Sequence, residues 1–326
     1  MKAIRIATIA CWIVAAVVLL GLAMWFLTGR MFGIGILGLS FGSGEQNGGI
    51  LDSLTGPFEV AGSYSVPADS LSSISIDWVA GDITVMPHDG NEVQITEFAR
   101  RELSYGEQLF YSTSGGTLTI KFTERSSWLN NMPAKKLEVY VPHALMEKLD
   151  RFAVDSTSGT VSAQNINADA VKIDTVSGNI DLSNIASRTF EADSTSGSIT
   201  LTSIETDDMK LNSMSGAISL SDVSAGTLKG DTVSGRCDLD GMFGEVDIDS
   251  VSGRISIIST IVPAKLKVDT TSGGITVTVP DEGAISVNHS SVSGRLSSDI
   301  PIITQGRDAQ FQLSSVSGGV KIQALG

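Results

Sequence analysis

The sequence predicts an all-β protein whose folded part is a single parallel β-helix, or β-solenoid, of about 19-residue coils. An N-terminal transmembrane helix is predicted to precede it. Two observations carry this prediction. A pentapeptide of the form [D/N/S]-[S/T]-[V/T/M]-S-G occurs nine times between Asp155 and Gly318. An uncharged stretch of 22 residues, Ile6 to Leu27, lies near the N-terminus.

The pentapeptide recurs with a nearly constant period. Its glycines are separated by 19, 19, 19, 19, 18, 20, 21 and 24 residues, and they are Gly159, Gly178, Gly197, Gly216, Gly235, Gly253, Gly273, Gly294 and Gly318. A fixed period near 20 residues is the signature of a solenoid, in which each repeat stacks on its neighbours. Parallel strands lie about 4.8 Å apart, so the repeats predict a rod of roughly 40 Å.

Apolar residues change phase across each glycine. Around Gly197 they stand seven and five positions before it (Phe190, Ala192) and two and four positions after it (Ile199, Leu201). A continuous strand cannot change phase, because its side chains alternate strictly. The chain must therefore turn or bulge at each Ser-Gly, where we expect glycine to supply the backbone freedom for the corner.

Two further features of each coil follow from the alignment on the glycine. A second bend is expected near the apolar residue seven positions after the glycine, which is Ile166, Ile185, Ile204 or Val223 in successive copies. The residue three positions before the glycine is always Ser or Thr. We expect these hydroxyl groups to hydrogen-bond up and down the stack, as hydroxyl pairs do across strands.

The region before the regular repeats is strand-rich but irregular. Ile74 to Val85 alternates with period two on both sides of Gly81 and reads as a degenerate first copy, with Trp78 where a small hydroxyl residue would stand. We expect residues 63–150 to form irregular N-terminal coils or a cap, and residues 151–326 to form the regular solenoid. The large indole and the longer loops can close the first rung and protect its edge.

Residues 1–30 are predicted to be a signal anchor. The 22-residue uncharged stretch would span about 33 Å as a helix, which is enough to cross a bilayer, and it favours an uncleaved anchor over a cleaved signal peptide. Lys2 and Arg5 outweigh Arg30, so the N-terminus is expected in the cytoplasm and the solenoid outside a cell membrane crossed once. Residues 31–62 are glycine-rich and are expected to be a flexible linker.

Charge and cysteine content narrow the choice of partners. The net charge of −14 argues against nucleic acid, whose phosphates would be repelled, and against broad docking onto anionic lipid. The two cysteines are Cys11, which lies inside the apolar stretch, and Cys237, which stands at a core position. No disulfide framework is therefore expected.

No catalytic set is found in the sequence, and no enzyme activity or cofactor is expected. His88, His143 and His289 belong to no His-x-x-His or HExxH pattern, and no Cys-x-x-Cys, Gly-x-Ser-x-Gly or phosphate-loop motif is present. Cys237 replaces Ile or Val in the repeat and reads as core filling. Three arginines share the position after the glycine: Arg236, Arg254 and Arg295.

The sharpest functional candidate is a file of aspartates four positions before the glycines. Its members are Asp155, Asp174, Asp193, Asp231, Asp249 and Asp269, with Asn212 in one copy. Stacked about 4.8 Å apart, these carboxylates repel one another. In one interpretation each Asp accepts hydrogen bonds from backbone N–H groups of the following Ser/Thr turn. In the other, the file binds Ca²⁺ or another hard cation.

The motif D-[ST]-x-S-G-x-[IVL]-x-[LIV], spaced by about 19 residues over roughly residues 65–325, resembles the DUF4097 β-strand-repeat family of adhesin-like proteins. LiaG-like membrane proteins of bacterial envelope-stress operons are similar. The resemblance implies a parallel β-helix, an N-terminal membrane anchor and an extracytoplasmic location. It transfers no catalytic residue to this chain.

Three functional hypotheses follow. The first is a non-enzymatic interaction module of the bacterial envelope that binds an envelope protein or a glycan. The second is a self-assembling scaffold, because the coil that ends in Val320 to Gly326 carries no cap and its open edge could stack end to end. The third is a carbohydrate-active β-helix enzyme, which would need a cluster of carboxylate or basic groups on one face.

Overall fold

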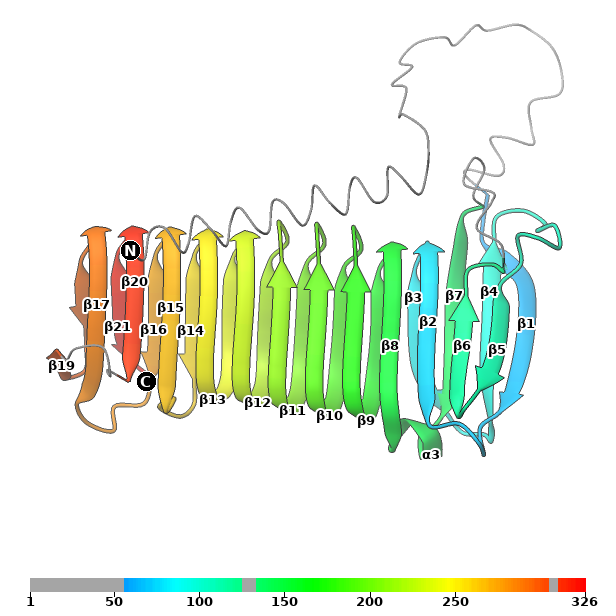
Figure 1. Cartoon of the computed structure of the whole chain (residues 1–326), viewed down its shortest axis with the longest axis horizontal. Helices are drawn as coiled ribbons and strands as arrows, with labels where there is room; N and C mark the ends of the chain where they lie inside the picture. Colours follow the sequence, from blue (N-terminus) through cyan, green and yellow to red (C-terminus); the bar gives the residue numbers. More distant parts are fainter. Residues whose placement is uncertain (1–55, 125–132, 305–309) are drawn as a thin grey trace, which may run out of the picture.

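The computed structural model describes residues 56–124, 133–304 and 310–326. In this part of the chain 21 strands and one short helix form a rod (Figure 1). The predicted anchor, Ile6 to Leu27, and most of the predicted linker lie outside the described residues. Among the residues that are described, no helix is long and apolar enough to cross a membrane.

The middle of the rod consists of five long, bent strands that stack in parallel. They are β9 (Val161–Thr175), β10 (Ile180–Ser194), β11 (Ile199–Ser213), β12 (Ile218–Ser234) and β13 (Cys237–Ser252). Neighbouring strands pair in register, so that Ile180 lies beside Ile199 and Leu182 beside Leu201. The predicted parallel β-helix of stacked coils is confirmed here.

The predicted second bend is confirmed and has a defined cause. In four successive coils the residue just before the inward apolar side chain is left-handed, with φ of 58°, 56°, 53° and 56° at Asn165, Asn184, Ser203 and Asp222. Asn and Asp tolerate this conformation better than most residues. The copy that follows Gly235 is one residue shorter, and the pairing of β12 with β13 accordingly shifts between Leu220 and Val223.

The glycine at each corner is required for two reasons, and the sequence predicted one of them, its backbone freedom. The φ is positive at the corners of Gly159, Gly253, Gly273 and Gly318, at 107°, 146°, 142° and 145°. Gly178 and Gly197 are outside the set of glycines with positive φ and are required by close approach. A Cβ added to Gly178 would lie 1.8 Å from the Gly159 carbonyl oxygen, and one added to Gly197 would lie 1.7 Å from that of Gly178. The corners stack so tightly that no side chain fits between them.

The Ser/Thr hydroxyls beside the corner act within their own coil, which corrects the prediction of bonds along the stack. Thr175 Oγ1 accepts the Gly178 N–H at 3.0 Å, and Ser194 Oγ accepts the Gly197 N–H at 2.8 Å. In these coils, and at Ser213, the hydroxyl therefore closes its own corner, three residues downstream. The equivalent oxygens of Thr232, Ser250, Thr270, Ser291 and Ser315 are buried without a partner.

The core consists of stacks of like apolar side chains. Ile199 and Leu201 are fully buried, and the same positions of neighbouring coils hold Ile, Leu, Val or Cys. Cys237 is 2% exposed, and its burial raises the pKa of its thiol to about 12, so the prediction of core filling is confirmed. Removing a stack of aliphatic side chains from water supplies the main stabilisation of such a fold.

The N-terminal end is built from shorter strands and one helix. In chain order they are β1 (Glu59–Pro67), β2 (Ser73–Ala80), β3 (Ile83–His88), β4 (Glu92–Ala99), β5 (Phe110–Ser114), β6 (Thr117–Lys121), β7 (Lys135–Pro142), α3 (His143–Met146) and β8 (Leu149–Ser158). The β2–β3 coil stacks on β8 and β9, whereas β6 and β7 lie outside it. Beyond these, β5 pairs with β6 and β4 with β7, both antiparallel, and β1 pairs with β4. We call this region, Glu59–Pro142, the N-terminal cap.

A buried ion pair lies inside the N-terminal cap. Lys135 Nζ is 2.6 Å from Glu97 Oε1, and both side chains are fully buried. The ammonium also donates to the Glu107 and Phe122 carbonyl oxygens and lies 5.0 Å from the centre of the Trp78 ring. Burial lowers the pKa of Lys135, while Glu97 opposes that shift.

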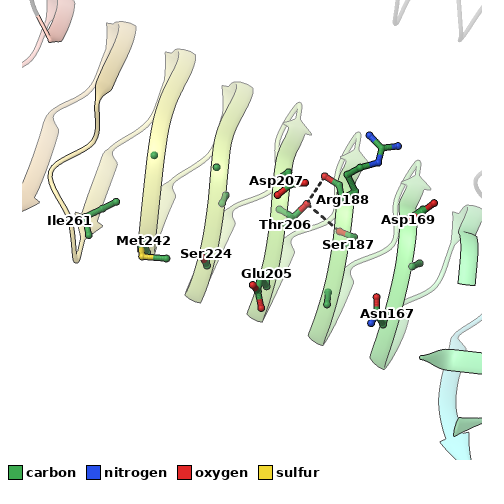
Figure 2. A pocket seen from close by; sticks show the side chains of 15 residues that line it. Asn167, Asp169, Ser187, Arg188, Glu205, Thr206, Asp207, Ser224, Met242 and Ile261 are labelled. Carbon is green, nitrogen blue, oxygen red and sulfur yellow. Dashed lines mark hydrogen bonds between the residues drawn. The ribbon is translucent and has the colours of Figure 1, made fainter. Parts of the chain in front are cut away.

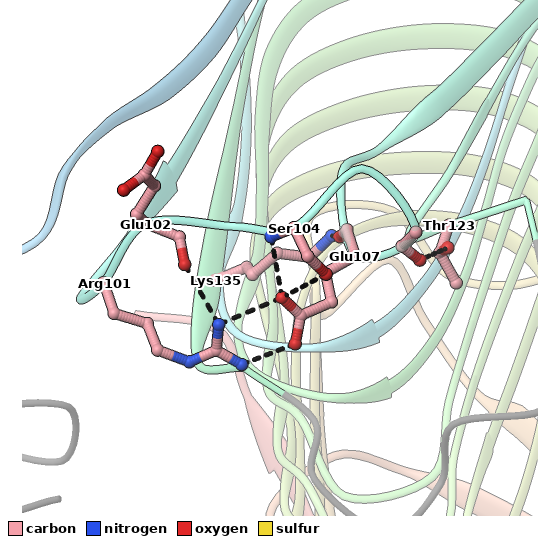
Figure 3. A network of polar contacts seen from close by, with 7 residues as sticks. Arg101, Glu102, Ser104, Glu107, Thr123 and Lys135 are labelled. Carbon is pink, nitrogen blue, oxygen red and sulfur yellow. Dashed lines mark hydrogen bonds and ion pairs between the residues drawn. The ribbon is translucent and has the colours of Figure 1, made fainter.

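The loop around this pair is fixed by a second ion pair (Figure 3). The Arg101 guanidinium donates to both carboxylate oxygens of Glu107, at 3.0 and 2.5 Å. Glu107 also accepts the backbone N–H of Ser104 at 2.8 Å. The hydrogen bond from Arg101 lowers the pKa of Glu107 to about 2.

The C-terminal end holds β14 (Ile255–Ser259), β15 (Lys265–Ser272), β16 (Ile275–Val279), β17 (Ile285–Ser293), β18 (Leu296–Ser298), β19 (Ile302–Thr304), β20 (Phe311–Ser317) and β21 (Val320–Ala324). Its coils are not stacked in chain order. The last coil, β20–β21, lies between β15–β16 and β17–β18, and β17 stands at the tip of the rod (Figure 1). The prediction of an open final coil at Val320–Gly326 is therefore wrong, because that coil is paired on both sides.

Candidate functional site

The predicted aspartate file is a continuous ladder on the outer surface of one sheet. Asp155 pairs with Asp174, Asp174 with Asp193, and Asp193 with Asn212. The structure adds one member that the sequence analysis left out, Asp77, which pairs with Asp155. The Asp ladder thus comprises Asp77, Asp155, Asp174, Asp193, Asn212, Asp231, Asp249 and Asp269. The signal for Asp77 was present, since it stands four positions before Gly81 as the others stand before their glycines.

A second file of charged side chains runs beside the ladder, two residues earlier in each coil. Its members are Lys172, Glu191, Lys210, Lys229, Asp247 and Lys267. Lys172 lies 3.2 Å from both Asp174 and Glu191, and Lys210 lies 2.7 Å from Glu191. Sequence reasoning missed this file, because its members are of both charges and form no motif.

Lys267 concentrates the ion pairing toward the C-terminal end of the ladder. Its Nζ is 2.6 Å from Asp247, 3.4 Å from Asp269 and 3.6 Å from Asp249. Burial lowers the pKa of Lys267, but the hydrogen bond to Asp247 and the charges of the other carboxylates outweigh burial and raise that pKa overall. One ammonium thus partly neutralises three carboxylates from two adjacent coils.

Burial raises the pKa of several ladder carboxyls. The pKa of Asp193 rises to about 6, chiefly through burial; Glu191 and Asp174 add to the shift, and a hydrogen bond from Asn212 opposes it. The pKa of Asp155 is also raised, by burial and by its neighbour Asp174. Asp231 and Asp249 are shifted in the same direction by burial. The ladder therefore holds protons at a pH where isolated carboxyls are ionised.

A groove follows the ladder along the rod. It has a volume of about 820 Å³ and extends from Asp77 to Asp231. Its other wall is a file of apolar and threonine side chains, two positions before the corner glycines, which includes Val176, Met214 and Val233. Val176 is 44% exposed. The groove therefore combines negative charge on one side with exposed apolar surface on the other.

Neither predicted role of the aspartates is seen as it was stated. Among the described residues, none of the hydrogen bonds of the ladder carboxylates comes from a backbone N–H of the following turn; the Ser/Thr hydroxyls take that place. The reason is geometric, because the aspartates point outward while the hydroxyl residues point inward. No group of three or more His, Cys, Asp or Glu in the described part could hold a metal ion, and cation binding stays a prediction.

Comparison with known proteins identifies the family. The Toastrack DUF4097 family matches residues 71–323. The chain belongs to the Toastrack family. No curated protein matches it significantly.

Solved structures share the Toastrack fold at low sequence identity. A "putative adhesin" from Parabacteroides merdae ATCC 43184 is 13% identical with a TM-score of 0.53, covering 83% of this chain and 98% of that one. A "putative lipid binding protein" from Parabacteroides distasonis ATCC 8503 is 15% identical with a TM-score of 0.51, with the same shares covered. A second "putative adhesin" from that organism is 11% identical with a TM-score of 0.52, over 80% and 96%. At these identities the likeness concerns the fold.

A second groove of this Toastrack rod lies on the side that follows the left-handed bend, and it differs in character. It has a volume of about 520 Å³ and is lined by side chains from consecutive coils, among them Asn167, Glu205, Met242 and Ile261 (Figure 2). Thr206 Oγ1 donates to the Arg188 carbonyl oxygen at 3.3 Å beneath it. Its charged side chains are Asp169, Arg188, Glu205 and Asp207, so one cation stands among three acids.

The structure brings together two of the three histidines. His88 pairs with Pro142, next to His143, and His143 Nε2 lies 3.8 Å from Asp89. His88 Nε2 is 2.8 Å from the Glu92 carbonyl oxygen. His289 lies at the other end of the rod, in β17. Of the three arginines after the glycines, Arg236 and Arg254 lie in adjacent coils. Arg295 is apart from them, because the coils of Gly273 and Gly318 lie between those of Arg254 and Arg295.

Proposed function

We propose that this Toastrack protein is an adhesin-like interaction module of the bacterial envelope that binds an extended partner along the Asp-ladder groove. The observation that carries the proposal is the groove itself, which repeats the same chemical pattern in consecutive coils. A repeating surface favours a partner that repeats too, such as an envelope glycan or an extended segment of an envelope protein.

The charges of the groove favour a partner with cationic groups. The ladder contains seven carboxylates and one amide. The neighbouring file contributes four lysines and two acids, so the surface keeps an excess of negative charge. Apolar groups of the partner would pack against the exposed apolar file and be removed from water. Complementary charge would set the rate and the specificity of binding, and apolar contact would add affinity.

The cellular placement belongs to the same proposal. The uncharged stretch Ile6–Leu27 would hold the rod on the outer side of the cell membrane, and the glycine-rich residues 31–62 would set its reach. The similarity to LiaG-like proteins connects such a module with envelope stress. We further propose that the protein is not an enzyme, since Cys237 is buried with its thiol pKa raised to about 12 and the ladder carboxyls lie among lysines.

A matched pair of variants tests the proposal. The triple variant Asp155→Asn, Asp174→Asn, Asp193→Asn removes three charges from the groove. The control Asp169→Asn, Asp181→Asn, Asp207→Asn removes three exposed charges from other sides of the rod. Binding of the detergent-solubilised chain to poly-L-lysine and to purified cell-wall glycan would be measured by biolayer interferometry, with sugar release assayed in parallel.

We expect the ladder variant to bind at least about tenfold more weakly to one of the two probes, and the control to stay within about twofold. Equal losses of binding in both variants would mean that net charge alone causes the loss, and would contradict binding in the groove. If the natural chain bound neither poly-L-lysine nor cell-wall glycan, the proposal would be wrong for these two classes of partner. Release of sugar that depends on Asp193 would make the protein a carbohydrate-active enzyme.

A further inference from the structure

The two ends of the rod are finished differently. At the N-terminal end the outermost strands run antiparallel to their neighbours. β1 carries a bulge between Val60 and Gly62 and ends at Pro67, and the rings of Tyr64 and Tyr111 meet at 5.2 Å across the end of the core. Bulges and proline are the devices by which proteins prevent an edge strand from pairing with another chain.

The C-terminal tip has fewer of these devices. β17 pairs on its inner side with β20, and on its outer side β19 covers only Ile285–Val287. Within the described part of the chain, no strand pairs with the outer side of residues 288–293 or of β18. Residues 288–293, Asn-His-Ser-Ser-Val-Ser, contain no lysine, proline or bulge. In the described part of the chain, six residues of β17 are thus left without a strand on their outer side.

Apolar surface gathers at the same tip. Val292 is 84% exposed and Ile303 is 49% exposed, although most large apolar side chains of this rod are buried. In the next coil, β20–β21, Val316 and Leu325 are each 38% exposed. In this coil His289 Nε2 is also buried without a hydrogen-bond partner; the unpartnered Ser291 Oγ is shared with the corner hydroxyls of other coils and does not distinguish the tip. These features are those of an interface that lacks its other half.

Charge at the tip favours a second copy of the same chain. Residues 285–304 contain one cation, Arg295, and one anion, Asp299, so this segment is neutral in a chain of net charge −14. Two copies can therefore approach tip to tip with less repulsion than along their sides. The two charges flank Ser297 symmetrically. If β18 pairs antiparallel with its own copy about Ser297, Arg295 faces Asp299 of the partner subunit, and the reciprocal pair forms as well.

We propose that two copies of this protein associate through the edge of β17 and β18 into a two-fold, tip-to-tip dimer. Antiparallel pairing of like strands continues both sheets of one rod into those of the other. A head-to-tail filament is not expected, because the N-terminal end offers antiparallel strands interrupted by a bulge and a proline. The dimer would leave the Asp ladder accessible and double its length.

Light scattering and a cysteine trap test the dimer. The full chain in detergent would be measured over about a hundredfold range of concentration, beside Val292→Lys at the tip. The control is Val176→Lys, which stands at the same position of a coil in the middle of the rod. We expect a dimer for the natural chain and for the control, and a monomer for Val292→Lys with an unchanged melting temperature.

The trap places Ser297→Cys in a Cys11→Ser background, with Ser219→Cys, also three positions after its corner glycine, as the control. Residues opposite each other in an antiparallel pair have Cα atoms about 4.5–5.5 Å apart, within the range that a disulfide spans. We expect mild oxidation to cross-link Ser297→Cys and not Ser219→Cys. A monomer at every concentration, a mass that grows beyond the dimer, or equal cross-linking of both variants would overturn the proposal.

Discussion

The N-terminal cap and the five central coils stabilise the same rod in different ways. In the central coils each contact is repeated, since Ile stacks on Ile, Leu on Leu and corner on corner. The cap has contacts that occur once, among them the Lys135–Glu97 pair and the edge-to-face contact of Trp78 with Phe122 at 4.9 Å. Repeated contacts spread stability over many residues, whereas the cap depends on a few. The difference predicts where single substitutions will do most harm.

The largest effect is expected from a charge placed in a central stack. Ile199→Asp or Leu201→Asp would bury a carboxylate between two apolar neighbours of identical type. We expect a loss of more than about 4 kcal/mol in the free energy of unfolding, together with a broader transition as several coils separate. Urea unfolding followed by circular dichroism measures both. Thr200→Asp, whose side chain is exposed between these two positions, is the control and should change little.

The cap should be nearly as sensitive at its buried pair. Lys135→Met leaves Glu97 buried without its partner, and we expect a loss of about 3–5 kcal/mol in urea unfolding. The double variant Lys135→Met, Glu97→Leu should recover much of that loss, because no charge is then left buried. Lys136→Met, next in sequence and 42% exposed, is the matched control. A single variant as stable as the natural chain would show that the cap does not depend on this pair.

An intermediate effect is expected at the stacked corners. Gly197→Ala would bring a methyl group to 1.7 Å from the Gly178 carbonyl oxygen, so two corners must move apart. We expect a loss of about 1–3 kcal/mol, measured as a fall in melting temperature. Gly106→Ala in the cap adds a methyl group to open space and should be nearly neutral. Similar shifts in the two variants would mean that the corners are looser than the structure indicates.

The smallest effect separates the two regions by their response to pH. The pKa of Asp193 in the folded state, about 6, lies above the ordinary carboxyl value, so folding takes up a proton between about pH 4 and 6. Its contribution to stability is greatest below that window and is lost as pH rises through 6. Glu107 has the opposite sign: its folded pKa, about 2, is depressed, so its contribution is present above about pH 4.5 and is lost as pH falls toward 2.

Melting temperatures from pH 3 to 7 test this contrast. Asp193→Asn should flatten the profile between pH 4 and 6, and Glu107→Gln should flatten it below pH 4.5. Asp155, Asp231 and Asp249, whose pKa values are raised too, would leave part of the slope in the first variant. Profiles of the two variants that change in the same pH range would contradict the assignment of these groups.

The repeat period predicted the architecture because it reports directly on stacking. The glycine spacing and the phase change located the corners, and Ile166 and its equivalents located the second bend. The order of the end coils could not be predicted in this way. Residues 285–298 and 311–322 carry the same pattern, so either segment could stack on β15–β16 as far as local sequence is concerned.

The repeat also explains which part of the candidate site could be predicted. Six aspartates and Asn212 were found because they share a place in the motif, but the charged residues two positions before them differ in sign and gave no pattern. The groove depends on how outward side chains of different coils lie together, which no single repeat shows. Glu97 and Lys135 are far apart in sequence and read as ordinary surface charges, so their burial was not foreseeable.

The exchanged order of the last two coils has a mechanical consequence. Because β21, the last strand, is hydrogen-bonded to β16 on one side and to β18 on the other, a pull on the chain beyond Ala324 loads two ladders together. Strands loaded lengthwise in this way must break many bonds at once, whereas an outermost terminal strand would peel away bond by bond. The last strand is thus held by a neighbour on each side, as the strands in the middle of the rod are.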